Sequence, residues 1–172
     1  MSYKITNAIT EPELADWLKQ AAEKLGTFAD GRVDYTKADV APIVMCTIAC
    51  GAELLLVKRG FGLADAEGYW STVNGFIDEI KAVQEQAKQE LKEELGLDIA
   101  TKDIRVGASY TVSNPKEKRH YIVFPCLITL PTKPKIILDH EHTEYTWIKR
   151  DKLESFHILD DLPYAIDSAL RA

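Results

Sequence analysis

Apolar residues recur at helical spacing near both ends of the chain. Between Glu11 and Leu25 they fall on one face, with Thr10 in the position of an N-cap and Gly26 as the stop. Residues 162–170 repeat the pattern. We therefore predict a helix at each end. The polar, turn-rich residues 27–39 are predicted to connect the first helix to the main fold.

From residue 41 the pattern changes to short β-rich runs. They cover residues 43–49, 54–58, 70–77, 104–112, 121–130 and 143–148. A further helix is predicted over residues 82–95. Its apolar residues Ala87, Leu91 and Leu95 share one face, and Gly96 is a natural C-cap. Most strands follow one another without an intervening helix, so the order predicts a mixed α/β domain rather than a regular βαβ repeat.

Composition narrows the class of protein. The chain has 172 residues, of which 46% are hydrophobic and 28% charged, which suits a single domain with a full core. Its formal net charge of −6 disfavours an extended nucleic-acid surface. Cys46, Cys50 and Cys126 are odd in number and lie in apolar runs, which favours free thiols in a reducing compartment. The N-terminal residues lack the apolar core of a signal peptide, and no run approaches the roughly 18 apolar residues of a membrane span. We expect a cytoplasmic protein with no membrane partner.

Three glutamates in the central helix are candidate metal ligands. Glu90, Glu93 and Glu94 are three and four residues apart, so all three can project toward one patch. Clustered carboxylates repel one another, and a hard divalent cation such as Mg²⁺ relieves that repulsion. The alternative is a solvated helix face with local ion pairs, such as Lys88 with Glu85.

The segment from Gly75 to Leu97 resembles the signature of the Nudix hydrolases, Gly-x5-Glu-x7-Arg-Glu-U-x-Glu-Glu-x-Gly-U, in which U is a bulky aliphatic residue. Gly75 matches the opening glycine. The second half is matched in register by Glu90, Leu91, Glu93, Glu94, Gly96 and Leu97. The resemblance implies an α/β/α sandwich with a mixed, mostly antiparallel sheet. It also divides the chain into an N-terminal helix and connecting segment, residues 1–39, and one Nudix hydrolase domain, residues 40–172.

The resemblance further implies a Mg²⁺-dependent hydrolase, with Mn²⁺ as an alternative ion, that cleaves the diphosphate linkage of a nucleoside-diphosphate-linked compound. Glu90, Glu93 and Glu94 are then the metal ligands. The partner is a small nucleotide-like substrate whose identity the family leaves open. The N-terminal helix either covers the core or contributes to a homodimer contact.

Two positions depart from the signature. Lys81 replaces its first glutamate and Gln89 replaces its arginine. Gln89 can donate hydrogen bonds but lacks the charge and rigid fork of a guanidinium. Asp78 or Glu79 could stand in for the missing acid. These departures motivate the alternative of a Nudix-like domain that binds a nucleotide without cleaving it.

A second acidic segment precedes the strand predicted over residues 143–148. It matches a Glu-His-x-x-Tyr-x-Trp spacing found in Nudix proteins, which makes Glu141 the first choice for a residue that completes the metal site or acts as general base, and Glu144 the second. His140 and His142 could assist proton transfer or contact phosphate. The alternative is that Tyr145 and Trp147 alternate into the core while the acids face water.

The expected catalytic residues are therefore Glu94, Glu141 and Glu90, with Glu141 or a helix glutamate accepting the proton of the attacking water. Lys58 and Arg59 end an apolar run and are the candidates for contacts with a substrate phosphate. Lys116, Lys118 and Arg119 could line the mouth of the site or simply be solvated.

Overall fold

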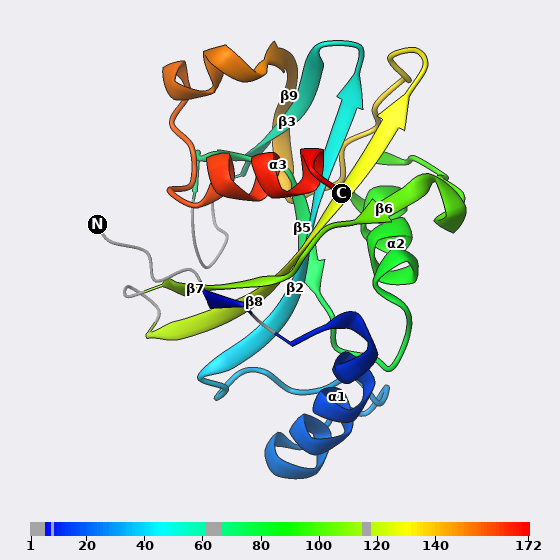
Figure 1. Cartoon of the computed structure of the whole chain (residues 1–172), viewed down its shortest axis with the longest axis vertical. Helices are drawn as coiled ribbons and strands as arrows, with labels where there is room; N and C mark the ends of the chain where they lie inside the picture. The colour runs from blue at the N-terminus through cyan, green and yellow to red at the C-terminus, as the bar shows by residue number, and fades with distance from the viewer. Residues whose placement is uncertain (1–5, 8, 61–66, 115–117) are drawn as a thin grey trace.

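The fold is a mixed β-sheet with helices on both faces, as the computed structural model shows for residues 6–7, 9–60, 67–114 and 118–172 (Figure 1). The α-helices are α1 (Glu11–Leu25), α2 (Val83–Leu95) and α3 (Leu162–Leu170), and the 3-10 helices are η1 (Thr101–Asp103) and η2 (Arg150–Ser155). The strands are β1 (Thr6–Asn7), β2 (Val40–Cys50), β3 (Glu53–Arg59), β4 (Trp70–Ser71), β5 (Val73–Phe76), β6 (Ile104–Val106), β7 (Tyr110–Asn114), β8 (Arg119–Leu130) and β9 (His142–Lys149).

The sheet runs in the order β1-β7-β8-β2-β3-β4, while β5 pairs with β2, β6 with β8 and β9 with β3. The central β2–β8 pair is parallel, and the other strand pairs between described residues are antiparallel. The expected α/β/α sandwich with a mixed, mostly antiparallel sheet is confirmed.

The helix predictions from periodicity are confirmed. α1 spans the predicted residues 11–25 and begins with a capping box, in which Thr10 N donates to Glu13 Oε2 at 2.7 Å. α2 starts one residue later than predicted and ends at Gly96, which adopts the left-handed conformation (φ 68°) of a C-cap. α3 spans the predicted residues 162–170.

Two predicted strands are each divided in the structure. The run 70–77 forms β4 and β5, which pair with different strands, β3 and β2. The run 104–112 forms β6 and β7, which pair with successive parts of β8 and are separated around Gly107. The local pattern is the same on both sides of each break. The breaks follow from pairing with other strands: β4 and β5 pair with different strands, and β6 and β7 with different parts of one strand.

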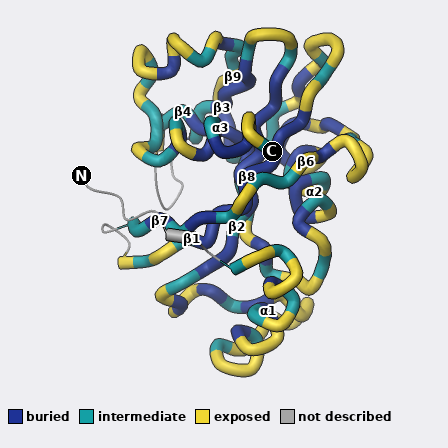
Figure 2. The backbone as a smooth tube through the Cα atoms, in the orientation of Figure 1, coloured by how far each residue is buried: buried dark blue, intermediate teal, exposed yellow. Residues whose placement is uncertain are grey.

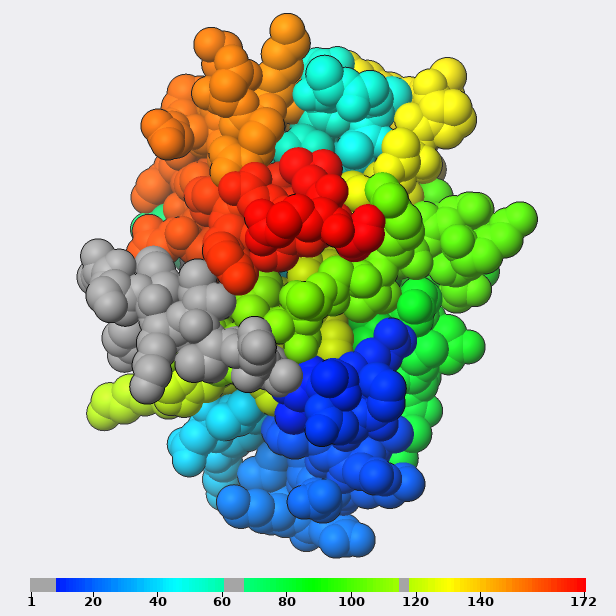
Figure 3. Space-filling model, viewed as in Figure 1, coloured from blue at the N-terminus to red at the C-terminus, as the bar shows by residue number. Residues whose placement is uncertain are grey.

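Two apolar clusters fill the space on the two faces of the sheet, and the buried backbone follows the central strands (Figure 2). α3 contributes to one cluster through Leu162 and Ile166. The other contains Leu91 of α2 together with Leu14 and Leu18 of α1. The N-terminal helix therefore covers the core, and its segment lies against the rest of the chain in the space-filling view (Figure 3). Among the described residues, no helix has both the length and the apolar character needed to cross a bilayer.

Candidate functional site

Helix α2 carries a polar row beside its buried apolar face. The apolar face consists of Val83, Ala87, Leu91 and Leu95, all fully buried. The neighbouring row consists of Gln86, Glu90 and Glu94, spaced four residues apart and directed toward the same side of the helix. Gln86 and Glu94 are buried and Glu90 is half-buried. Glu94 and, in part, Glu90 thus differ from the solvated helix face of the alternative interpretation, whereas Glu93 is exposed. Lys88 pairs with Asp98 at 3.2 Å, not with Glu85.

Gly75 leaves the space that the Glu90 carboxylate occupies above the sheet. It lies in β5 opposite Val44 of β2, directly below α2. A Cβ atom at Gly75 would overlap the carboxylate of Glu90. The glycine that opens the motif is thus required for the close approach of this side chain to the strand.

The carboxylate of Glu94 is buried without a complete set of hydrogen bonds. Its residue is 5% exposed, and Oε2 lacks a hydrogen-bond partner. Burial, together with the charges of Glu90, Glu141 and Asp139, raises the pKa of Glu94 to about 10. Glu94 is therefore protonated at neutral pH unless a cation occupies its surroundings.

Glu90 has a milder environment. Gln86 Nε2 donates to its Oε1 at 2.5 Å. The pKa of Glu90 is raised to about 7, mainly by burial and also by the charges of Glu93 and Glu141, while the Gln86 hydrogen bond opposes the shift. Its proton is thus exchanged near neutrality, which is the range that suits a general base.

The segment before β9 runs along the C-terminal end of α2. Ile137 N donates to Leu95 O at 3.0 Å and Asp139 N to Glu94 O at 3.1 Å. These backbone contacts place the acidic segment beside Glu94. Glu141 of this segment is a candidate from the sequence. Its negative charge raises the pKa of Glu90 and of Glu94, so it is close enough to both carboxylates to act on them.

His142 and Asp139 complete the surroundings of Glu94. The Asp139 carboxylate accepts from Glu141 N at 3.0 Å and lies 3.2 Å from His142 Nδ1. Desolvation lowers the pKa of the buried His142, so its imidazole is neutral. With its proton on Nδ1, toward Asp139, His142 presents the lone pair of Nε2, which lies 3.6 Å from Glu94 Oε2 and lacks a hydrogen-bond partner.

Glu93 lies on the outer side of α2, exposed to solvent. Gln89 Nε2 donates to Glu93 Oε1 at 2.9 Å. Gln89 also contacts Lys81, so the two departures from the signature lie together. Asp78 is held in an ion pair with Arg32 at 3.6 Å.

The basic candidates are divided by a bulge in β3. The register shifts between Lys58 and Arg59. The positive charge of Arg59 lowers the pKa of Glu94, so Arg59 is close enough to act on this carboxylate. Lys58 Nζ lies 2.6 Å from Glu144 Oε1 and over the Trp70 ring.

The other candidates are spread over the surface. Arg119 donates to the carbonyls of Tyr35 and Ala38, so it braces the N-terminal connection. Lys118 has a left-handed backbone (φ 53°), and Lys116 lies outside the described residues. His140 is exposed beside Asp139.

The aromatic residues of β9 behave differently from the alternative interpretation. Trp147 packs half-buried against the core, but Tyr145 is 44% exposed. The expectation that both alternate into the core is wrong for Tyr145. β9 forms hydrogen bonds with β3 alone among the described strands, and most of its residues are exposed or half-buried.

The site residues fit a hard divalent cation. In the described part of the chain, no three His, Cys, Asp or Glu side chains already converge as a ligand set. Glu90 and Glu93 are turned toward glutamines, whereas Glu94 keeps one buried oxygen without a partner. Oxygen donors that repel one another, one of them buried and unsatisfied, are the donor type that Mg²⁺ prefers.

Sequence reasoning did not assign roles to Gln86 or Asp139. Gln86 could have been found from its four-residue spacing to Glu90. Asp139 begins the acidic segment, but its contact with His142 depends on a turn that the sequence does not specify.

Comparison with known proteins shows the family and the fold. The NUDIX domain family model matches residues 39–166, and the chain belongs to the Nudix family. A search of curated protein sequences gives no significant match.

Solved structures share the fold at low sequence identity. The MutT protein from Methanosarcina mazei Go1 has a TM-score of 0.65 at 16% identity, with 78% of this chain and 96% of that chain covered. The NUDIX domain of Shewanella oneidensis NrtR, solved with ADP ribose, also gives 0.65 at 16% identity, covering 87% and 96%. The E. coli dihydroneopterin triphosphate pyrophosphohydrolase gives 0.57 at 17% identity, covering 76% and 96%.

Proposed function

We propose that this protein is a Mg²⁺-dependent hydrolase that cleaves the diphosphate linkage of a small nucleoside-diphosphate-linked compound. Nudix hydrolases generally act on such compounds, and Mn²⁺ is the alternative ion. The observation that carries the proposal is the buried, unpartnered Oε2 of Glu94 next to Glu90. A protein without a cation to bind gains nothing from this arrangement, because burying an unsatisfied carboxyl group costs about 1–3 kcal/mol.

The proposed ligands are Glu90, Glu93 and Glu94. Glu90 would exchange its hydrogen bond with Gln86 for a contact with the ion, and Glu93 would bind through Oε2 while Gln89 holds its Oε1. When bound, Mg²⁺ supplies neutralisation of phosphate charge and a lowered pKa for bound water.

The remaining roles belong to residues around these carboxylates. Glu141, or Glu90 with its pKa of about 7, accepts the proton of the attacking water. Arg59 contributes positive charge on the carboxylate side and contacts a phosphate of the substrate, together with Lys58 once Lys58 leaves Glu144. The neutral His142 holds Asp139 and leaves Nε2 directed at Glu94.

The decisive experiment is a Mg²⁺- and Mn²⁺-dependent screen across diphosphate compounds, with the products identified by mass. The panel contains ADP-ribose, nucleotide sugars, dinucleoside polyphosphates, nucleoside triphosphates and capped RNA ends. Metal-dependent cleavage between two phosphates, abolished by chelation, is expected. Absence of any product, with metal bound, would reject the enzyme assignment.

The second candidate is a Nudix-like domain that binds a nucleotide without cleaving it. Lys81 and Gln89, in place of the signature's glutamate and arginine, favour it, and the NrtR domain was solved with ADP ribose. This candidate predicts ligand binding in calorimetry with no product after prolonged incubation. The buried thiols of Cys46 and Cys126 support the further proposal that either activity operates in the cytoplasm.

A further inference from the structure

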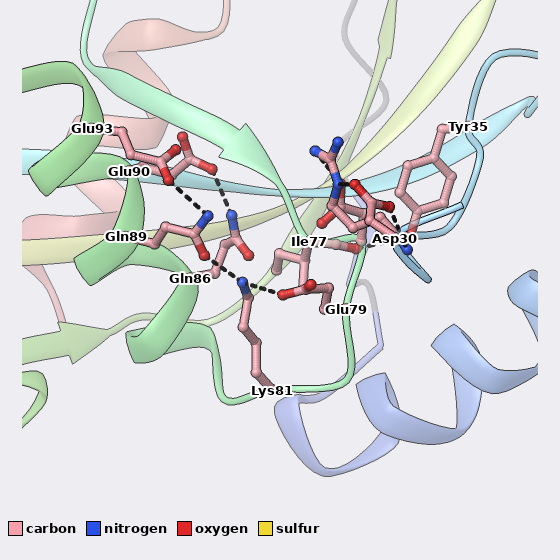
Figure 4. Close-up of polar contacts among 11 residues, drawn as sticks. Asp30, Tyr35, Ile77, Glu79, Lys81, Gln86, Gln89, Glu90 and Glu93 are labelled. Carbon is pink, nitrogen blue, oxygen red and sulfur yellow. Dashed lines mark hydrogen bonds and ion pairs between the residues drawn. The ribbon is translucent and has the colours of Figure 1, made fainter. Parts of the chain in front are cut away.

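The two residues that depart from the Nudix signature form one hydrogen-bonded chain. Lys81 Nζ donates to Gln89 Oε1 at 2.7 Å and lies 2.8 Å from Glu79 Oε2 (Figure 4). Gln89 Nε2 in turn donates to Glu93 Oε1 at 2.9 Å. The Lys81 side chain is only 15% exposed, whereas Glu79, Gln89 and Glu93 are exposed, so the lysine is the least exposed member of the group.

The chemistry of the Gln89 amide determines which of its ends faces Lys81 and which faces Glu93. An amide has one end that accepts and one that donates, and an ammonium group can only donate. Lys81 therefore takes the oxygen of Gln89 and leaves its NH₂ group for Glu93. An acid at position 81 would attract the NH₂ group instead and turn the amide oxygen toward the Glu93 carboxylate, which repels it.

We propose that Lys81 is a positioning residue that, through the Gln89 amide, orients Glu93 for a divalent cation, so that the two departures compensate each other. A glutamate at position 81 and an arginine at position 89 can form an equivalent bridge, because the guanidinium donates to both carboxylates. The inference rests on the proposed function, because it assigns Glu93 to the metal site.

The N-terminal segment fixes the loop that carries Lys81. Val33 N donates to Asp78 O at 2.8 Å, and the Tyr35 hydroxyl donates to Ile77 O at 2.8 Å. The backbone a few residues before Lys81 is thus held at two points. A fixed backbone limits the positions that the lysine side chain can reach and favours its contact with Gln89.

The test is a double-mutant cycle that comprises Lys81→Glu, Gln89→Arg and the double variant. Lys81→Met is added as a variant that removes the charge alone. Mn²⁺ affinity is measured by calorimetry on the folded protein. We expect Lys81→Glu and Lys81→Met to weaken Mn²⁺ binding about tenfold, as loss of a residue that orients a metal ligand does. The double variant should return to within about threefold of the wild type. In turnover assays kcat should fall with little change in KM.

The matched control is Lys88→Glu, which makes the same charge change on the neighbouring helix α2 but removes only the ion pair with Asp98. It should bind Mn²⁺ like the wild type. An equal loss in Lys88→Glu, or a double variant no better than the single ones, would overturn the proposal while leaving the metal site intact.

A wild type that binds no Mn²⁺ overturns the proposed function instead. The urea-unfolding midpoints of the metal-free variants then test whether Lys81 and Gln89 interact. Shifts that simply add in the double variant would show that Lys81 and Gln89 do not interact, and would overturn the positioning role as well.

Discussion

At the scale of single residues, the site is defined by one buried carboxyl group, that of Glu94. Glu94 has its pKa raised to about 10 by burial, whereas His142 beside it has its pKa lowered by the same cause. Both groups are therefore neutral at pH 7, although an acid and a base stand 3.6 Å apart. A divalent cation would favour the ionised form of Glu94, which the apolar surroundings alone disfavour.

Replacing Glu94 by Gln should abolish catalysis without unfolding the protein. The amide keeps the volume and neutrality of the protonated acid but cannot take a negative charge toward the metal. We expect kcat to fall by at least about 100-fold in Mg²⁺. Circular dichroism should remain that of the wild type. Glu23→Gln, an exposed change on α1, is the control. Full Mg²⁺-dependent turnover in both Glu94→Gln and Glu93→Gln would contradict the ligand assignment.

The same variant should stabilise the metal-free protein at alkaline pH. A carboxyl group whose pKa is raised by folding contributes stability below its unfolded pKa of 4.5, and this is lost as the pH rises toward the folded value of about 10. The wild type should therefore lose stability between pH about 5 and about 9. Glu94→Gln lacks this loss and should melt about 5 °C higher at the alkaline end. Equal slopes of Tm against pH for both proteins would show that Glu94 is not buried as described.

Gly75→Ala should impair the metal site more than the fold. The added Cβ meets the end of a flexible side chain, the Glu90 carboxylate, which can move aside at low cost to stability. We expect metal affinity to fall about 10–100-fold with a small change in Tm. Because the effect acts through Glu90, adding Gly75→Ala to Glu90→Gln should cause little further loss. A large further loss would mean that the glycine serves the backbone instead.

At the scale of elements, helices were predicted well and strand boundaries less well. The spacing of apolar residues determines a helix locally, so α1, α2 and α3 fall within a residue of their predicted bounds. A strand needs a partner, which is why residues 70–77 divide between β3 and β2. The glutamates of α2 were found because one helix fixes their spacing. Asp139 and Gln86 were not, because their roles depend on contacts between side chains that the pattern leaves open.

Tyr35 links the N-terminal segment to the loop before α2 through one buried hydrogen bond to Ile77 O. Tyr35→Phe removes the donor and leaves this carbonyl oxygen unsatisfied, so the free energy of unfolding should drop by about 1–2 kcal/mol. Urea denaturation measures the loss. Tyr164→Phe, at an exposed ring of α3, should cost much less. Equal losses for the two variants would argue against the bracing role of this bond.

At the scale of the whole molecule, metal binding should be linked to proton release. The protein carries a formal charge of −6, yet two of its glutamates hold protons. Burial and mutual repulsion raise the pKa of Glu94 to about 10 and that of Glu90 to about 7. A cation that binds the ionised carboxylates must displace these protons. At pH 7 we expect release of about one to two protons per site, from Glu94 and in part from Glu90.

Calorimetric titration with Mn²⁺ in HEPES and in Tris measures this release, because the apparent enthalpy changes with the ionisation enthalpy of the buffer. Glu94→Gln removes the larger contribution and should reduce the buffer dependence by about one proton. The exposed control Glu23→Gln should leave it unchanged. Tight binding with equal enthalpies in both buffers would place the ion away from Glu94, since no other proton-releasing group has been assigned to the site. Proton release that is undiminished in Glu94→Gln would transfer the role of Glu94 to Glu90.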